Sequence, residues 1–136
     1  MAEEPLKVLM VDDDPVDFRI VVRHLETVRA PGYRLQHAGD LETARRMLGD
    51  EAFDAALVDF RMPGGASGLE FVNSMGGREA TLPFVILTGM SDGDLDRQAL
   101  LAGAYDYIDK MAMTRELVDR AIRFAVTSFR YERDLR

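Results

Sequence analysis

The sequence contains no cysteine and only 2 histidines. Disulfides and thiolate metal sites are therefore excluded, and a zinc site is not expected from two histidines. Basic residues are also scarce, because 17 lysines and arginines stand against 24 aspartates and glutamates, which gives a net charge of -7. This balance argues against direct nucleic-acid binding as the main function, and it favours partners that carry cations or a basic surface.

Long apolar runs are absent too. No run is long enough to cross a membrane, and the N-terminal "MAEEPLK" lacks the apolar segment of a secretory signal. The chain has 136 residues, of which 47% are hydrophobic, as expected of one ordinary domain with a real core. We therefore expect a soluble, cytoplasmic domain that does not contact the membrane.

Short apolar runs alternate with amphipathic stretches along the chain. Residues 7–12, 53–59 and 83–88 are apolar almost throughout, which is typical of strands buried on both faces. Residues 33–38 and 104–109 alternate apolar and polar side chains, which is typical of half-exposed strands. The sequence therefore predicts five strands, three central and two at the edges.

The amphipathic stretches between these runs predict helices. Asp14 with Pro15, then Asp40, and later Ser91 or Asp92, have the chemistry of helix starts. Five strands that alternate with five helices imply parallel strands joined by crossover helices in three layers, α/β/α. With the alternating strands at the edges, the strand order is 2-1-3-4-5. The predicted fold class is therefore a flavodoxin-like, doubly wound α/β sheet.

Polar side chains follow the strands at the points where ligands bind in such sheets. Asp12 and Asp13 follow the first strand, Asp59 ends the third, Thr88 ends the fourth and Lys110 follows the fifth. The carboxyl ends of parallel strands meet at one edge of the sheet, so we expect these side chains to converge.

Three converging carboxylates repel one another unless a cation neutralises them. Mg2+ is suited to the task, because it is bound through few carboxylates and keeps several waters. It would also attract a phosphoryl group, whose oxygens Lys110 and Thr88 could contact. A neighbouring carboxylate could then act as the nucleophile and form an aspartyl phosphate.

Four fragments in this order carry a resemblance to a known family: "VDDD" at 11–14, "ALVDFRMP" at 56–63, "VILTG" at 85–89 and "YDYIDK" at 105–110. Over nearly its full length the chain resembles the receiver (CheY-like) domain of two-component response regulators. The resemblance implies that Asp59 is the phospho-acceptor. It also implies that Asp13 binds Mg2+ directly, that Asp12 acts mainly through water, and that the backbone carbonyl of Arg61 is a further ligand.

The same resemblance assigns a switch. It implies that Thr88 is the hydroxyl that turns toward the phosphoryl group, and that Gly89 keeps space open beside it. Tyr107 matches the aromatic side chain whose rotamer changes on phosphorylation, although an aromatic residue in an edge strand also fits plain packing. Lys110 matches the family's lysine.

Three features depart from the family pattern. Met111 stands where the family usually has a proline after the lysine, so we expect a trans bond or a rebuilt loop. The loop from Pro63 to Gly68 is one residue longer than usual, which affects the fit of partners. Arg61 places a long cation beside Asp59, where it could alter the lifetime of a phosphoryl group.

The last helix is expected to start near Thr114, and it carries two apolar stripes. One consists of Val118, Ile122, Ala125 and Phe129 and should pack on the sheet. The other has heptad-like spacing and continues further: Leu117, Ala121, Phe124, Ser128, Tyr131 and Leu135. We therefore expect a receiver domain over residues 1–129. Residues 130–136 would extend its last helix, either as a signalling helix or as a frayed tail.

The leading hypothesis is a phosphorelay switch. A histidine kinase or phosphotransfer domain would phosphorylate Asp59, and the face of the fourth helix, fifth strand and fifth helix would change its affinity for a partner or a second copy. Such a protein catalyses only its own phosphorylation and dephosphorylation. Alternatives are a receiver from a larger kinase or cyclase protein, and a degenerate interaction module. A phosphatase of the haloacid dehalogenase kind is disfavoured, because Arg61 stands where its second acid would be.

Overall fold

The computed structural model describes residues 4–29, 31–65, 67–89 and 93–135. The helix start predicted at Ser91 or Asp92 lies outside these residues. The strands are β1 (Leu6–Val11), β2 (Tyr33–Ala38), β3 (Ala55–Asp59), β4 (Phe84–Thr88) and β5 (Asp106–Asp109). The helices are α1 (Pro15–Leu25), α2 (Leu41–Asp50), α3 (Gly68–Ser74), α4 (Gly93–Leu101) and α5 (Arg115–Asp134).

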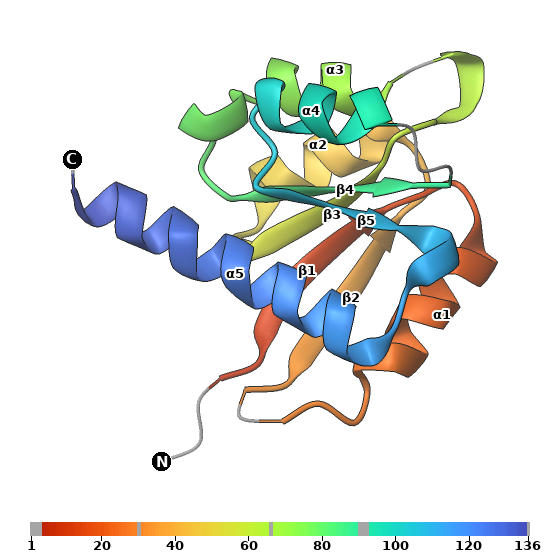
Figure 1. Cartoon of the computed structure of the whole chain (residues 1–136), viewed down its shortest axis with the longest axis vertical. Helices are drawn as coiled ribbons and strands as arrows, with labels where there is room; N and C mark the ends of the chain where they lie inside the picture. Colours follow the sequence, from red (N-terminus) through yellow and green to blue (C-terminus); the bar gives the residue numbers. More distant parts are fainter. Residues whose placement is uncertain (1–3, 30, 66, 90–92, 136) are drawn as a thin grey trace.

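The five strands form one parallel sheet in the order β2-β1-β3-β4-β5. Helices α1 and α5 cover one face of the sheet, and α2, α3 and α4 cover the other (Figure 1). The prediction of a flavodoxin-like, three-layer fold with alternating strands at the edges is therefore confirmed.

The central strands hold the two layers of helices together because both of their faces are apolar. In β1, Val8 and Met10 pack into the core beneath α1 and α5, whereas Leu9 and Val11 pack into the core beneath α2 and α3. Strands β3 and β4 are buried along their whole length. Side chains alternate between the faces of a strand, so a continuous apolar run supplies both cores at once.

The helices begin where the sequence indicates. The carboxylate of Asp14 accepts a hydrogen bond from the backbone N–H of Val16 at 2.8 Å, and Pro15 occupies the first turn of α1. The carboxylate of Asp40 caps α2 by accepting from the N–H of Thr43 at 2.7 Å. Because α1 starts only after Asp14, Asp12 and Asp13 remain at the end of β1.

A close backbone contact fixes the connection from β3 to α3. The short 3-10 turn Pro63–Gly65 lies in this connection, and Arg61 pairs with Ser67 across it. The N–H of Gly68 donates to the carbonyl of Phe60 at 2.8 Å. A Cβ at Gly68 would lie 2.1 Å from the carbonyl oxygen of Asp59. Only glycine fits at this position without moving the backbone of Asp59.

Helix α5 buries the first predicted stripe and also the start of the second, because Ala121 lies in the same core and Leu117 packs against it. Val118, Ile122 and Ala125 are buried and Phe129 packs against the same core, which confirms the first stripe. In the second stripe Phe124, Tyr131 and Leu135 are 56%, 66% and 71% exposed.

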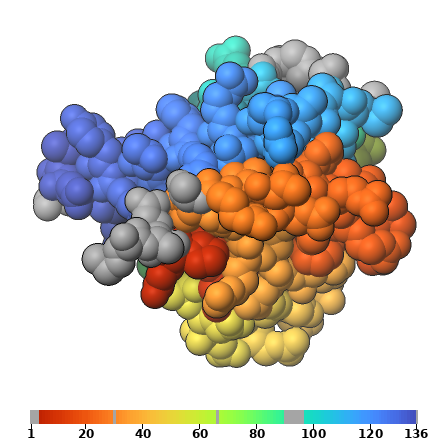
Figure 2. Space-filling model, turned by 90° about the horizontal axis from the view of Figure 1, so that it is seen from below, coloured from red at the N-terminus to blue at the C-terminus, as the bar shows by residue number. Residues whose placement is uncertain are grey.

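The end of α5 projects from the rest of the domain (Figure 2), but several of its side chains contact that domain. Glu132 accepts hydrogen bonds from Tyr105 and from Arg78. Arg130 lies 3.3 Å from Asp54. The boundary at residue 129 stays a prediction, although these contacts reach beyond it. In the described part of the chain, no helix has both the length and the apolarity needed to span a bilayer.

The contact at Gly68 can be tested with one substitution made at two glycines. Gly68→Ala should lower the free energy of unfolding by about 2 kcal/mol, because the new Cβ meets the Asp59 backbone. Gly49→Ala, in α2 with no heavy atom within 4 Å of the new Cβ, should raise it by about 0.5–1 kcal/mol. Urea denaturation measures the free energy of unfolding of both variants. If both substitutions changed it by the same amount in the same direction, the close contact at Gly68 would be contradicted.

Candidate functional site

Strand ends bring the predicted polar residues together. Asp12 follows β1, Asp59 ends β3, and Lys110 follows β5. The ammonium of Lys110 lies 2.8 Å from Oδ2 of Asp12 and 3.0 Å from Oδ2 of Asp59. These pairs join residues 98 and 51 positions apart in the sequence. The expected convergence is present, whereas the chemical roles of these residues remain predictions.

Asp12 is the most enclosed member of the site. Its side chain is fully buried, and its Oδ1 accepts the backbone N–H of Asp14 at 2.9 Å. Its own backbone carbonyl lies 2.6 Å from Nε2 of His37, which must donate because a carbonyl oxygen can only accept. The His37 ring stacks on Phe18 at 4.7 Å between centroids. The end of β1 is thus held from both α1 and β2.

A group of carboxylates here could hold a metal ion. Asp12, Asp13 and Asp59 each offer an oxygen within 4.8 Å of the others. Two of the three are buried and Asp13 is exposed, so one side of the group is open to water. Oxygen donors, a net negative charge and an open side fit a hard divalent cation that keeps part of its water shell, such as Mg2+.

The electrostatics of Asp59 reflect burial and opposing neighbours. Burial raises the pKa of its carboxyl group above the usual value, and the Asp12 carboxylate adds to that rise. Hydrogen bonding and attraction to Lys110 lower the pKa and offset part of the rise. The ionised form of Asp59 is therefore disfavoured by its surroundings, and a further cation nearby would stabilise it.

Lys110 shows the complementary effect. Burial by itself would lower the pKa of its ammonium group, but hydrogen bonds to Asp12, Asp17 and Asp59 outweigh it and raise the pKa above the usual value. Lys110 is therefore a permanent cation at the centre of the site.

The remaining predicted residues lie around this centre. Thr88 is buried at the end of β4, in register with Asp109 of β5, next to Lys110. The backbone N–H of Arg61 donates to Oδ1 of Asp59 at 3.3 Å, while the Arg61 side chain is exposed. Apart from its chain neighbours, no heavy atom of the residues that the structure describes lies within 4 Å of a Cβ built on Gly89. Tyr107 lies on β5 and is 39% exposed.

The loop after Lys110 is a short turn that includes Met111. Residues Lys110–Ala112 form a 3-10 turn that Asp109 caps. The N–H of Met111 donates to Oδ1 of Asp109 at 2.8 Å, a bond that a proline could not make.

Sequence reasoning missed two residues of the site. Asp17, on the first turn of α1, lies 2.9 Å from the ammonium of Lys110, and His37 contacts the backbone of Asp12. The signal for Asp17 is an acidic residue one helical turn after a cap that itself follows the acidic strand end. His37 sits in the strand that pairs with β1, in register with Met10. Its sequence position alone carries no such signal.

Comparisons with known proteins agree with this geometry. The family model described as the response regulator receiver domain matches residues 8–122. The response regulator protein PilR of Pseudomonas aeruginosa is 35% identical over 122 residues, which cover 86% of this chain and 26% of PilR. Histidine protein kinase 1 of Candida albicans is 28% identical over 124 residues, which cover 83% of this chain and 5% of that protein.

A solved structure shares the fold. The crystal structure of a response regulator receiver domain protein (CheY-like) from Methanospirillum hungatei has a TM-score of 0.77 and 24% identity. The match covers 94% of this chain and 98% of that one. This chain spans about half or less of the length of the curated relatives that it matches.

The raised pKa of Asp59 predicts a pH-dependent stability difference. The folded protein takes up this proton at higher pH than the unfolded chain, so ionised Asp59 costs stability at neutral pH. Asp59→Asn should therefore be more stable than the parent at pH 7. The difference should shrink as the pH falls through the raised pKa toward 3.8, the ordinary value.

Asp40→Asn is the matched control for this pH series. Its carboxylate accepts the N–H of Thr43, which lowers the pKa of Asp40, and asparagine caps a helix equally well. This variant should show no gain in stability at pH 7. Urea unfolding over the pH series measures both variants, and an Asp59→Asn variant no more stable than the parent at pH 7 would refute the electrostatic account.

Proposed function

This chain belongs to the family of response regulator receiver domains, and we propose that it is a working phospho-acceptor in a two-component phosphorelay. A histidine kinase or a phosphotransfer domain donates the phosphoryl group to Asp59 in the presence of Mg2+. The observation that carries this proposal is the buried Asp59 carboxylate, which lies 3.0 Å from Lys110 and within 4.8 Å of two further carboxylates.

The residues of the site divide the chemistry among them. A carboxylate oxygen of Asp59 forms a bond to phosphorus while the bond from phosphorus to the donor's imidazole nitrogen breaks, and that electron pair leaves with the nitrogen. Lys110 and the hydroxyl of Thr88 donate to phosphoryl oxygens. The N–H of Arg61 holds Oδ1 of Asp59 in place. Water later attacks the phosphorus, which restores the carboxylate and releases phosphate.

The acidic group is proposed to hold the cation. Asp13 and Asp59 would bind Mg2+ directly, with the backbone carbonyl of Arg61, and Asp12 would act through water. Bound Mg2+ would neutralise charge on the carboxylates and on the phosphoryl oxygens. The donor would approach from the side of Asp13, because that carboxylate is exposed.

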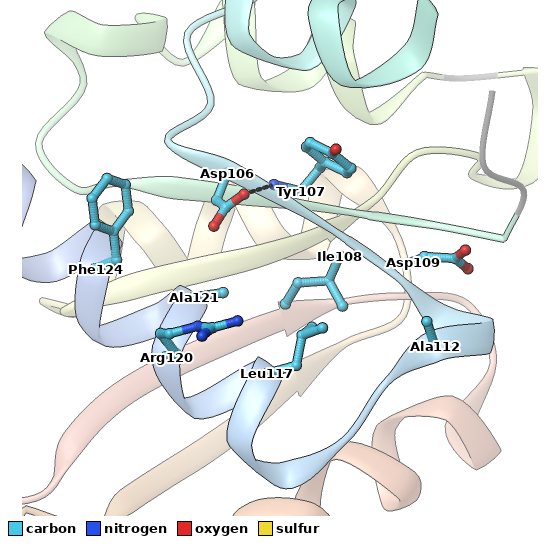
Figure 3. A pocket seen from close by; sticks show the side chains of 9 residues that line it. All are labelled: Asp106, Tyr107, Ile108, Asp109, Ala112, Leu117, Arg120, Ala121 and Phe124. Carbon is cyan, nitrogen blue, oxygen red and sulfur yellow. Dashed lines mark hydrogen bonds between the residues drawn. The ribbon is translucent and has the colours of Figure 1, made fainter. Parts of the chain in front are cut away.

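The response is proposed to leave the site through Thr88 and Tyr107. Asp106 and Tyr107 of β5 line a groove of about 490 Å³ with Leu117, Arg120 and Phe124 of α5. Figure 3 shows Tyr107 on the opposite side of β5 from Ile108, which points toward α5. The groove is lined by β5, by α5 and by Ala112 of the turn between them, so it includes two of the three elements of the proposed α4, β5 and α5 face. A change at Tyr107 would therefore alter how the face binds a partner or a second copy of the chain.

A receiver within a larger signalling protein is the second candidate. It is favoured by the similarity to a segment of a histidine kinase, and by the small share of each relative that this chain spans. In either setting we propose action in the cytoplasm, without direct contact with nucleic acid or membrane. The only reaction proposed is the protein's own phosphorylation and dephosphorylation.

Phosphorylation by a small donor tests the proposal directly. With acetyl phosphate and Mg2+, intact mass should increase by one phosphoryl group, and Asp59→Asn should show no increase. Chelation of Mg2+ should also abolish it. Asp40→Asn, which keeps its helix cap, should react like the parent. The absence of an adduct that depends on both Asp59 and Mg2+ would contradict phosphorylation by small donors and favour a non-phosphorylated interaction module.

Self-association tests the proposed response. A beryllofluoride-loaded protein should associate more tightly than the free protein, measured by sedimentation at several concentrations. Phe124→Ala, at the edge of the groove and 56% exposed, should weaken that association about tenfold. Val16→Ala, on α1 and 49% exposed, should leave it unchanged. Association that is equal in the loaded and free forms would contradict a self-associating switch.

A further inference from the structure

Asp17 contacts the central cation of the site from outside the metal-binding group. Its Oδ2 lies 2.9 Å from the ammonium of Lys110, where the side chains are 29% and 18% exposed. Asp12 and Asp59, the other two partners of Lys110, both belong to the group of carboxylates suited to a metal ion. Asp17 is outside that group.

The hydrogen-bonding capacity of Lys110 is fully used. An ammonium group has three N–H donors and no acceptor. The three donors match three carboxylates, with Asp12 at 2.8 Å, Asp17 at 2.9 Å and Asp59 at 3.0 Å. When Asp59 carries a phosphoryl group as an acyl phosphate, the Lys110 N–H that had bonded to its carboxylate becomes free. That donor is then aimed at the new phosphoryl oxygens, provided that the other two contacts keep the ammonium in place.

A cation in the acidic group would weaken one of those two contacts. A divalent ion beside Asp12 and Asp59 withdraws their charge from Lys110 and repels the ammonium itself. Asp17 is outside the group that would bind the ion, so its attraction to Lys110 is not directly weakened.

The surroundings strengthen the Asp17 contact. Met10, Ile20 and Met113 line a small, partly open cavity of about 30 Å³ together with Asp17 and Lys110. Both charged side chains are mostly covered by protein, and attraction between charges is stronger where water screens it less. The contact is therefore more than a solvated surface pair.

We propose that Asp17 is a positioning residue, which holds Lys110 beside Asp59 when a divalent cation occupies the site. The inference rests on the proposed function, because it concerns the same phosphoryl transfer. Without Asp17, Lys110 would leave its position beside Asp59 when the cation binds. Phosphorylation would then be slower, because Lys110 would be in place for a smaller share of the encounters with a donor.

Lysine signals in nuclear magnetic resonance test the proposal without any reaction. The sequence holds no lysine besides Lys7 and Lys110. With labelled lysine, each side chain therefore gives its own signal, and Lys7, paired with Glu51 at 2.6 Å, is an internal reference. On addition of Mg2+, the side-chain signals of Lys110 should stay shifted from free-lysine values in the parent. They should move to those values in Asp17→Asn, whereas Lys7 should not change in either protein.

The kinetic arm uses a matched control at the same helix start. Asp14→Asn removes one negative charge from the first residues of α1 but keeps the cap that accepts the N–H of Val16. At saturating Mg2+, Asp17→Asn should be phosphorylated by acetyl phosphate roughly fivefold more slowly than the parent. Asp14→Asn should react within about twofold of the parent.

The outcomes separate the two proposals. A parent that accepts no phosphoryl group overturns the proposed function. A parent that is phosphorylated, beside an Asp17→Asn variant that matches Asp14→Asn in rate and retains the Lys110 signals, overturns the role of Asp17 alone. In a Lys110→Gln background, Asp17→Asn should no longer slow phosphorylation, because Asp17 acts through the Lys110 ammonium.

Discussion

The repulsion among Asp12, Asp13 and Asp59 is the constraint on which the rest of the site depends. Two of these carboxylates are buried, and the third lies at the surface beside them. The folded chain answers the repulsion with one cation, Lys110, which touches two members of the group. One positive charge against several carboxylates leaves a net negative site, and such a site is suited to a divalent cation.

Local backbone structure holds Asp59 and Lys110 in position. The absence of a side chain at Gly68 lets the start of α3 lie against the carbonyl of Asp59. The N–H of Arg61 then reaches the Asp59 carboxylate. On the other side, Lys110 begins a 3-10 turn that Asp109 caps, and its ammonium reaches into the site. Two short loops thus position Asp59 and Lys110 at one edge of the sheet.

The last helix links the groove to the far end of the molecule. Phe124 of α5 lines the groove beside β5, and two turns later Glu132 bonds to Tyr105, which directly precedes β5, and to Arg78. The Arg78 guanidinium also stacks over the Tyr105 ring at 3.8 Å. The start of β5 is therefore tied to the last turns of α5. The exposed side chain of Tyr131 therefore lies on a part of α5 that contacts the body of the domain through Glu132.

The sequence by itself determined the features that depend on neighbouring residues. Apolar runs identified the strands, cap chemistry located the starts of α1 and α2, and strand ends pointed to Asp12, Asp59, Thr88 and Lys110. These features follow from local pattern and from the rule that parallel strands end at one edge. The same pattern could not choose between a signalling helix and a frayed tail after residue 129.

Tertiary structure alone decided the remaining contacts. Asp17 resembles any solvated acid on a helix until α1 is placed against the sheet and turned toward Lys110, which is 93 positions away. Likewise, Glu132 gains its role from Tyr105 and Arg78, which are 27 and 54 positions away. Such pairings depend on how helices rotate and pack on the sheet. That packing is set by the whole core and not by any one segment.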